Sequence, residues 1–278
     1  MQRKLLAATV AAGPFLALAL GGAPSAALAQ TTISTATTAP VATATANAGA
    51  PSDIVVSSAG SITPTTPGAI VTLNSNNSVT ISGPLSTKNI SDVTGVRAIG
   101  GNTGNIEIGN AISLVSDYQA TDSDNDGDLD GPAADGANRI GLRVTGPAPF
   151  NGNIKIIAGG QLNATGADSA GALIETQLNG SFSIAGAATV VGDRVYGIRT
   201  TGAISGPVRI EGAINVTGLD AVGVALDGDL ASSLVFQGGV TATGFRYTSR
   251  PQLDIQRNGL DAGDKLLGGT AVRIGGNV

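Results

Sequence analysis

The residues best suited to metal chemistry stand in one acidic stretch, residues 122–131, which reads DSDNDGDLDG. Carboxylates at alternate positions and a glycine at the sixth match the first half of a calcium-binding loop, because Ca2+ prefers several oxygen ligands. The pattern predicts a weak Ca2+ site whose ligands are Asp122, Asp124, Asp126, Asp128 and Asp130. Ala133 stands where such loops carry a bidentate glutamate, so a solvated acidic loop tip is the alternative.

Two other groups of side chains have the chemistry to bind ligands. Arginine recurs at one position of a repeat, as Arg97, Arg143, Arg199 and Arg273. An outward ladder of these residues would suit acidic glycans, whereas a solvated face whose stems cover apolar surface is the alternative. Residues 245–251, FRYTSRP, combine two aromatic and two cationic side chains that could dock sugar or protein, or pack against the flank of the fold.

Catalytic chemistry has little support in this chain. The sequence has no His and no Cys, which excludes Ser-His-Asp and Cys-His sites and His-ligated zinc. A glycosidase needs two carboxylates at a set separation, for which Glu211, Asp220, Asp227 and Asp229 are the candidates, although aspartate beside glycine is ordinary turn chemistry. We expect no enzyme. The net charge of −5 also argues against nucleic acid as a partner.

A 26-residue repeat must position all of these side chains. Gly171, Gly197 and Gly223 are 26 residues apart, and apolar residues keep the same step, as in Phe182, Val208 and Leu234. Each repeat has three short segments of alternating apolar and polar residues separated by Gly or Asn. Three strands and three corners form one coil of a parallel β-helix, which buries its apolar face only by stacking on the next coil.

The expected fold is all-β, a right-handed parallel β-helix of about seven coils, because crossovers between parallel strands are right-handed. The expected coils begin at Ala69, Gly95, Gly141, Gly171, Gly197, Gly223 and Ala271. A β-sandwich is the alternative, but it gives no reason for a strict step. Two insertions, from about Ser116 to Arg139 and from about Gly244 to Gly269, follow the third segment of a coil, so we expect both to leave the same corner.

The N-terminal part has a different composition. Residues 1–29 read as a secretory signal, with Arg3 and Lys4 before an apolar run and a cleavage site at residues 27–29. A transmembrane anchor is the alternative, but Gly and Pro interrupt the run. Residues 30–53, rich in Thr, Ala and Pro, are expected to form a flexible leader, and residues 54–278 the β-helix. Loss of Arg3 and Lys4 would lower the net charge from −5 to −7.

The signal, the Thr/Ala-rich leader and a Gly-rich, Cys-free β-helix together resemble the passenger region of bacterial autotransporters, the type V secretion family. Segments such as Gly197-Ile198-Arg199, Val208-Arg209-Ile210 and Ile214-Asn215-Val216 are similar to that family's coils. The resemblance rests on pattern and covers the chain from about Ser52 onward.

The resemblance implies export and display at the cell surface, in association with the outer membrane, by a β-barrel translocator that follows the passenger. Residues after Gly223 do not show the strand pattern of such a barrel, so the chain is expected to be the N-terminal part of a passenger. The family implies adhesion or scaffolding, with glycans or proteins of host or neighbouring cells as partners. A carbohydrate-active β-helix enzyme, of the polysaccharide lyase or glycosidase type, is the alternative function.

Overall fold

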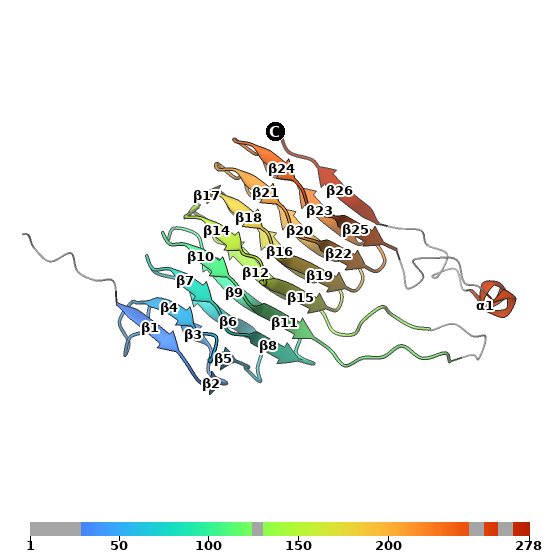
Figure 1. Cartoon of the computed structure of the whole chain (residues 1–278), viewed down its shortest axis with the longest axis horizontal. Coiled ribbons are helices and arrows are strands. Elements are labelled where there is room, and N and C mark those ends of the chain that lie inside the picture. Colours follow the sequence, from blue (N-terminus) through green and yellow to red (C-terminus); the bar gives the residue numbers. More distant parts are fainter. Residues whose placement is uncertain (1–28, 124–129, 245–252, 261–268) are drawn as a thin grey trace, which may run out of the picture.

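The computed structural model describes residues 29–123, 130–244, 253–260 and 269–278. These residues form a β-solenoid of about eight turns in which parallel strands stack along one axis (Figure 1). The prediction of a parallel β-helix is confirmed, with about one more turn than the seven expected. Within these ranges no helix has the length and hydropathy needed to cross a membrane.

Three parallel sheets of eight strands run the length of the solenoid, and every turn adds one strand to each. Sheet A consists of β1 (Gln30–Ile33), β4 (Asp53–Val56), β7 (Val79–Ile81), β10 (Ile106–Ile108), β14 (Ile154–Ile156), β18 (Phe182–Ile184), β21 (Val208–Ile210) and β24 (Leu234–Phe236). Sheet B consists of β2 (Ala36–Thr37), β5 (Ser61–Ile62), β8 (Leu85–Lys88), β11 (Ala111–Val115), β15 (Gln161–Thr165), β19 (Ala187–Val191), β22 (Ile214–Thr217) and β25 (Val240–Thr243).

Sheet C carries the longest strands. It consists of β3 (Val41–Ala42), β6 (Gly68–Leu73), β9 (Val93–Ile99), β12 (Arg139–Thr145), β16 (Ala170–Ile174), β20 (Tyr196–Thr200), β23 (Val222–Leu226) and β26 (Thr270–Ile274). A small sheet pairs β13 (Phe150–Asn151) with β17 (Leu178–Asn179), and one short helix, α1, spans Asp254–Gly259.

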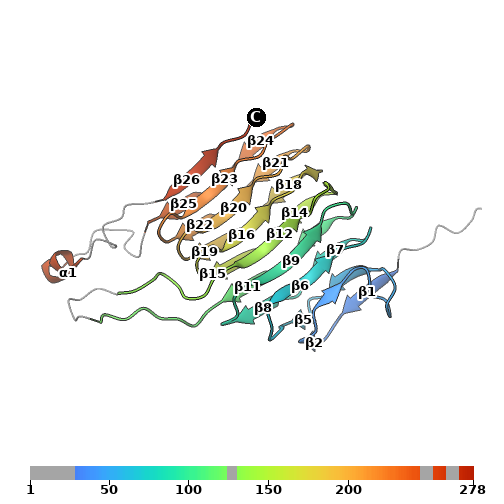
Figure 2. The same cartoon turned by 180° about the vertical axis from the view of Figure 1, so that it is seen from behind.

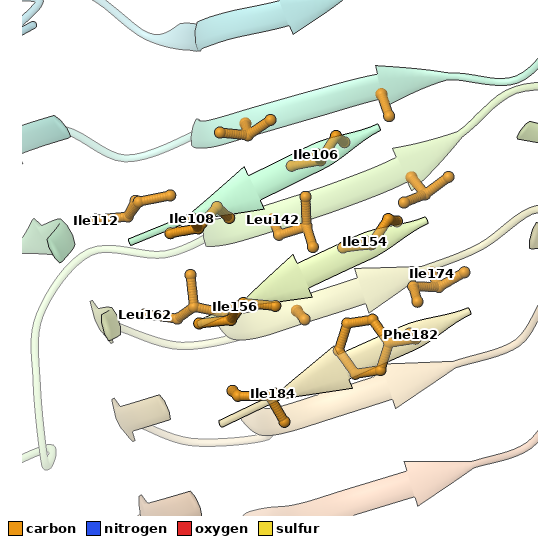
Figure 3. Packing of buried hydrophobic residues seen from close by; sticks show 14 of the residues in the cluster. Ile106, Ile108, Ile112, Leu142, Ile154, Ile156, Leu162, Ile174, Phe182 and Ile184 are labelled. Atoms are coloured by element: carbon orange, nitrogen blue, oxygen red, sulfur yellow. The ribbon is translucent and has the colours of Figure 1, made fainter. Parts of the chain in front are cut away.

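Inward side chains stack in columns along the axis, as the repeat predicts. Phe182 pairs with Val208 and Val208 with Leu234 in sheet A. The same column continues below through Ile154 and Ile106, both fully buried. Figure 3 shows Ile106, Ile154 and Phe182 on successive strands and pointing into the core. Stacking therefore buries apolar surface that a single coil would leave in water.

Residues 30–53 correct one expectation. They do not form a flexible leader but the first turn of the solenoid, in which β1 pairs with β4 in parallel register. Polar hydrogen bonds add to the apolar packing here: the buried hydroxyl of Thr43 accepts from the backbone N of Asn74, and the carboxylate of Asp53 accepts from the side chain of Asn77. The register of sheet C gives a second correction, because Val71 pairs with Val96, so the first expected coil start is Ile70 rather than Ala69.

A column of glycines shapes sheet C. Gly95, Gly141, Gly171, Gly197 and Gly223 open successive coils, and none of them appears in the ladder that pairs their neighbours. A Cβ atom added to Gly171 would lie 2.5 Å from the carbonyl oxygen of Gly197, and one added to Gly95 would meet the side chain of Ile112. β9, β12, β16, β20 and β23 therefore each carry a bulged residue at which a side chain would collide with its neighbours.

Both insertions leave the corner between sheets B and C, as predicted. One lies between β11 and β12 and the other between β25 and β26, and β15, β19 and β22 separate β11 from β25 in sheet B. The described parts of the two insertions project to the same side of the solenoid in both views (Figures 1 and 2). Residues 245–251, predicted as a docking segment, and residues 1–28 of the predicted signal lie outside the described residues.

Candidate functional site: a groove beside the loop corner

A groove of about 600 Å3 lies on the outer face of sheet C, next to the corner from which the insertions leave. Its charged and polar lining includes Asp92, Arg97, Asn138, Arg143 and Asp168. These residues come from three consecutive turns, which include β9, β12 and the turn before β16. The groove therefore exists only because the coils stack in register.

The bulged glycines allow residues on either side of them to point to the same face of sheet C. Thr94 and Arg97 are three residues apart in β9, yet both line the groove. Residues three apart on a regular strand would point to opposite faces. The extra residue at Gly95 restores the common direction, and Gly141 does the same for Ile140 and Arg143 in β12.

Asp92, Asn138 and Asp168 line the other side of the groove. They belong to a column of residues whose backbone is in the left-handed region. Asp92, Asn138, Asp168, Arg194 and Asp220 stack at the corner before sheet C, with φ between 55° and 57°. Asparagine and aspartate tolerate this conformation better than other non-glycine residues. Side chains tie the column together: the Asn138 amide donates to Asp92 at 2.9 Å, and Arg194 donates twice to Asp168, at 2.8 and 2.7 Å.

The predicted arginine ladder is present but largely paired. Arg97 and Arg143 are register neighbours, and Arg199 and Arg273 lie further along the same column. Arg143 makes two hydrogen bonds of 2.8 Å to Glu175, and Asp227 accepts from both Arg199 and Arg273. Within the described chain, Arg97 alone of the four makes no ion pair. It is exposed and faces the groove.

These ion pairs hold carboxyl pKa values down. The hydrogen bond from Arg273 lowers the pKa of Asp227 below its ordinary value of 3.8, with Arg199 adding to the effect. The hydrogen bond from Arg194 likewise lowers the pKa of Asp168. Burial raises the pKa of Glu175, but the hydrogen bond and the charge of Arg143 together outweigh it, so the net shift is downward from 4.5.

We expect acid to destabilise the solenoid through these groups. A carboxyl whose pKa is lower in the folded state stabilises the fold above its unfolded pKa, and this contribution disappears as the pH falls through the folded value. The melting temperature should therefore be flat from pH 7 to about 5 and fall below about pH 4. Asp227→Asn should cost about 1 kcal/mol at pH 7, a figure kept small because the partner arginines are partly exposed.

Thermal unfolding followed by circular dichroism across pH 2–7 measures this prediction. The difference between the parent and Asp227→Asn should shrink as the pH falls below 4, because protonation removes the charge that the substitution also removes. A difference that persists undiminished at pH 2 would show that Asp227 acts through packing and not through charge.

Sequence reasoning missed one buried cation at the root of the first insertion. Arg139 is 1% exposed, and its guanidinium donates to the backbone carbonyls of Ile90, Asp135 and Thr165 at 2.6–2.8 Å. Burial lowers its pKa, but no carboxylate side chain bonds to it directly in the described residues. Arg139 therefore fastens the returning end of the insertion to the coils on either side.

The predicted calcium ligands are only partly described. Asp122 and Asp130 are described, whereas Asp124, Asp126 and Asp128 lie outside the described residues. The backbone of Thr121 pairs with that of Asp130 in antiparallel fashion, and the Asp130 carboxylate accepts from the backbone N and the hydroxyl of Ser123. Among the described side chains no group of three potential ligands gathers around a metal position. The Ca2+ site stays a prediction.

Three of the four carboxylates considered for catalysis bind other groups. Asp227 binds two arginines, Asp229 accepts from the backbone and side-chain amides of Asn277, and Glu211 accepts from Arg209. Asp220 belongs to the left-handed column. None of these four lines the groove.

Comparison of the chain with protein-family models, with curated proteins and with solved structures gave no match. The groove and the loop corner are therefore interpreted from their own geometry.

Proposed function

We propose that this protein is a non-catalytic, surface-displayed solenoid that acts as an adhesin or scaffold, of the kind found in autotransporter passengers. The observation that carries the proposal is the placement of both insertions at one corner. Insertions into a repeat array collect on the face that binds, because the stacked coils tolerate length changes only where the chain turns. The proposal includes export and attachment at the outer membrane, with a β-barrel translocator as the export partner.

The solenoid itself suits a scaffold. Its core consists of stacked aliphatic columns, and most of its described arginines are neutralised by nearby carboxylates. Such a rod presents a regular flank of low net charge, from which two loops project. The main contacts with a neighbouring cell would then come from the loop corner and the surface beside it.

Removing both loops tests the proposal. Residues 116–135 are deleted, so that Gly136, Ala137 and Asn138 follow Val115 as residues 166–168 follow Thr165 in an uninterrupted coil, and the buried Arg139 is kept. Residues 245–268 are replaced by Leu-Asp, which copies residues 219–220. The register of neighbouring strands predicts that both joints close without strain. We expect the circular dichroism spectrum to be unchanged and the retention of bacterial cells on a protein-coated surface to fall at least tenfold.

Two results would contradict the proposal. Equal cell retention by the loop-free variant would show that the loops are not the binding surface. If the parent chain retained no cells, the proposed adhesive function would be refuted.

A carbohydrate-active enzyme is the second candidate, because two carboxylates, Asp92 and Asp168, line one groove. They lie two turns apart, roughly 10 Å at strand spacing. A glycosidase general acid needs a raised pKa, whereas Arg194 lowers that of Asp168. Release of reducing ends from a polysaccharide, lost in Asp168→Asn, would favour the enzyme over the adhesin.

A further inference from the structure

We infer that the groove on sheet C is a binding site for an acidic oligosaccharide, with its anionic group held by Arg97. The inference rests on the proposed adhesive function and deepens it, because it assigns a ligand class to a surface other than the loops. Three properties of the groove support it: an arginine at one end that makes no ion pair with the described residues, an aspartate–asparagine pair at the other, and apolar side chains in its lining.

The charge at one end of the groove is positive. Arg97 and Arg143 are neighbours on adjacent strands, and Glu175 neutralises only Arg143 through two hydrogen bonds. One guanidinium charge is left over and is exposed to the groove. Because a guanidinium offers a planar fork of donors, it binds a carboxylate or sulfate through two hydrogen bonds.

The opposite end offers acceptors and amide groups for hydroxyls. Asp92 lies five residues before Arg97, at most roughly 16 Å away at the rise of an extended strand. It accepts from the Asn138 side chain through Oδ1, and its other oxygen accepts no hydrogen bond from the described residues. Sugar hydroxyls are both donors and acceptors, so an aspartate–asparagine pair suits them well.

The groove also has apolar side chains among its polar lining. Ala69 on β6 and Ile140 on β12 line it, and Leu173 on β16 lies beside Arg143. Such side chains can pack against the C–H surface of a sugar ring, whereas a compact inorganic anion would leave them uncovered. Arg97 at one end, hydroxyl partners at the other and some apolar side chains in the lining therefore favour an elongated saccharide that carries an acid group.

Titration of the full chain with a galacturonic acid oligomer, followed by calorimetry at low salt, tests the inference. The matching neutral galactose oligomer serves as the ligand control. We expect the acidic oligomer alone to bind, and we expect Arg97→Gln to weaken its binding at least tenfold, because a charge-assisted hydrogen bond is lost. Arg209→Gln is the matched protein control, since Arg209 is an arginine of sheet A outside the groove.

Each outcome decides the matter. Equal binding of the neutral oligomer would overturn the role of the acid group, and equal weakening by the two substitutions would show diffuse attraction and not a site. Absence of binding by the folded parent up to 10 mM (on the order of the weakest useful affinities) would remove the site. Titration of the loop-free variant separates the two proposals: saccharide binding that survives while cell retention is lost leaves the groove and the loops as independent sites.

Discussion

Replacing Gly197 by alanine should destabilise the solenoid by about 3 kcal/mol, the upper range for overpacking a rigid interior. The added Cβ atom would meet the side chain of Ile214 and would lie 2.5 Å from the carbonyl oxygen of Gly223. The Ile214 side chain has some freedom to rotate, but the Gly223 carbonyl is backbone of the next strand and moves only if the ladder separates. Urea unfolding followed by circular dichroism measures the change in free energy.

Gly239→Ala is the matched control for this substitution. A Cβ atom at Gly239 would find no other atom within 4 Å, and Gly239 is not among the glycines with positive φ. Alanine there should be neutral or stabilise the fold by about 0.5 kcal/mol, because it restricts the unfolded chain. Similar losses of stability at both positions would disprove the steric role of the bulged column.

Arg139→Met should also destabilise the protein by about 3 kcal/mol. Methionine keeps much of the apolar stem but leaves the carbonyls of Ile90 and Thr165 without their donor in a buried place. Each unsatisfied buried acceptor costs about 1–3 kcal/mol. The returning end of the first insertion should loosen as well, because the bond to the carbonyl of Asp135 is lost.

Limited proteolysis separates the local effect from the global one. Cleavage within residues 116–138 should speed up strongly in Arg139→Met while strands of the far turns stay protected. Arg209→Met is the control, because Arg209 is an exposed arginine paired only with Glu211, and the substitution should change stability by less than about 0.5 kcal/mol. An unchanged proteolytic pattern in Arg139→Met would mean that the insertion is held by other contacts.

The repeat in the sequence was sufficient to predict the fold because stacking demands identical spacing of inward residues. Phe182, Val208 and Leu234 keep that spacing and form one column. The first turn escaped prediction for two reasons. Thr31 pairs with Ile54 and Ile54 with Val79, so coils there are 23 and 25 residues long, and hydrogen-bonded Thr43 and Ser52 occupy buried positions.

The groove was harder to foresee than the fold. The arginine column was visible in the sequence, but its pairing was not, because Arg143 reaches a glutamate 32 residues away that lies one turn above. The left-handed column carries a signal that was overlooked: Asp92, Asn138 and Asp168 each stand three residues before the glycine that opens a coil. Asparagine and aspartate at a fixed distance from such a glycine indicate a corner that needs positive φ.

The corner between sheets B and C has an evolutionary consequence. It accepts excursions after β11 and after β25, while the turn between β15 and β16 closes it with only four residues. Since the ladders on either side keep their register in all three cases, segments of different length can be accommodated at this edge without a change in strand pairing. The loops at this corner can thus differ in length and sequence while the three stacked sheets stay the same.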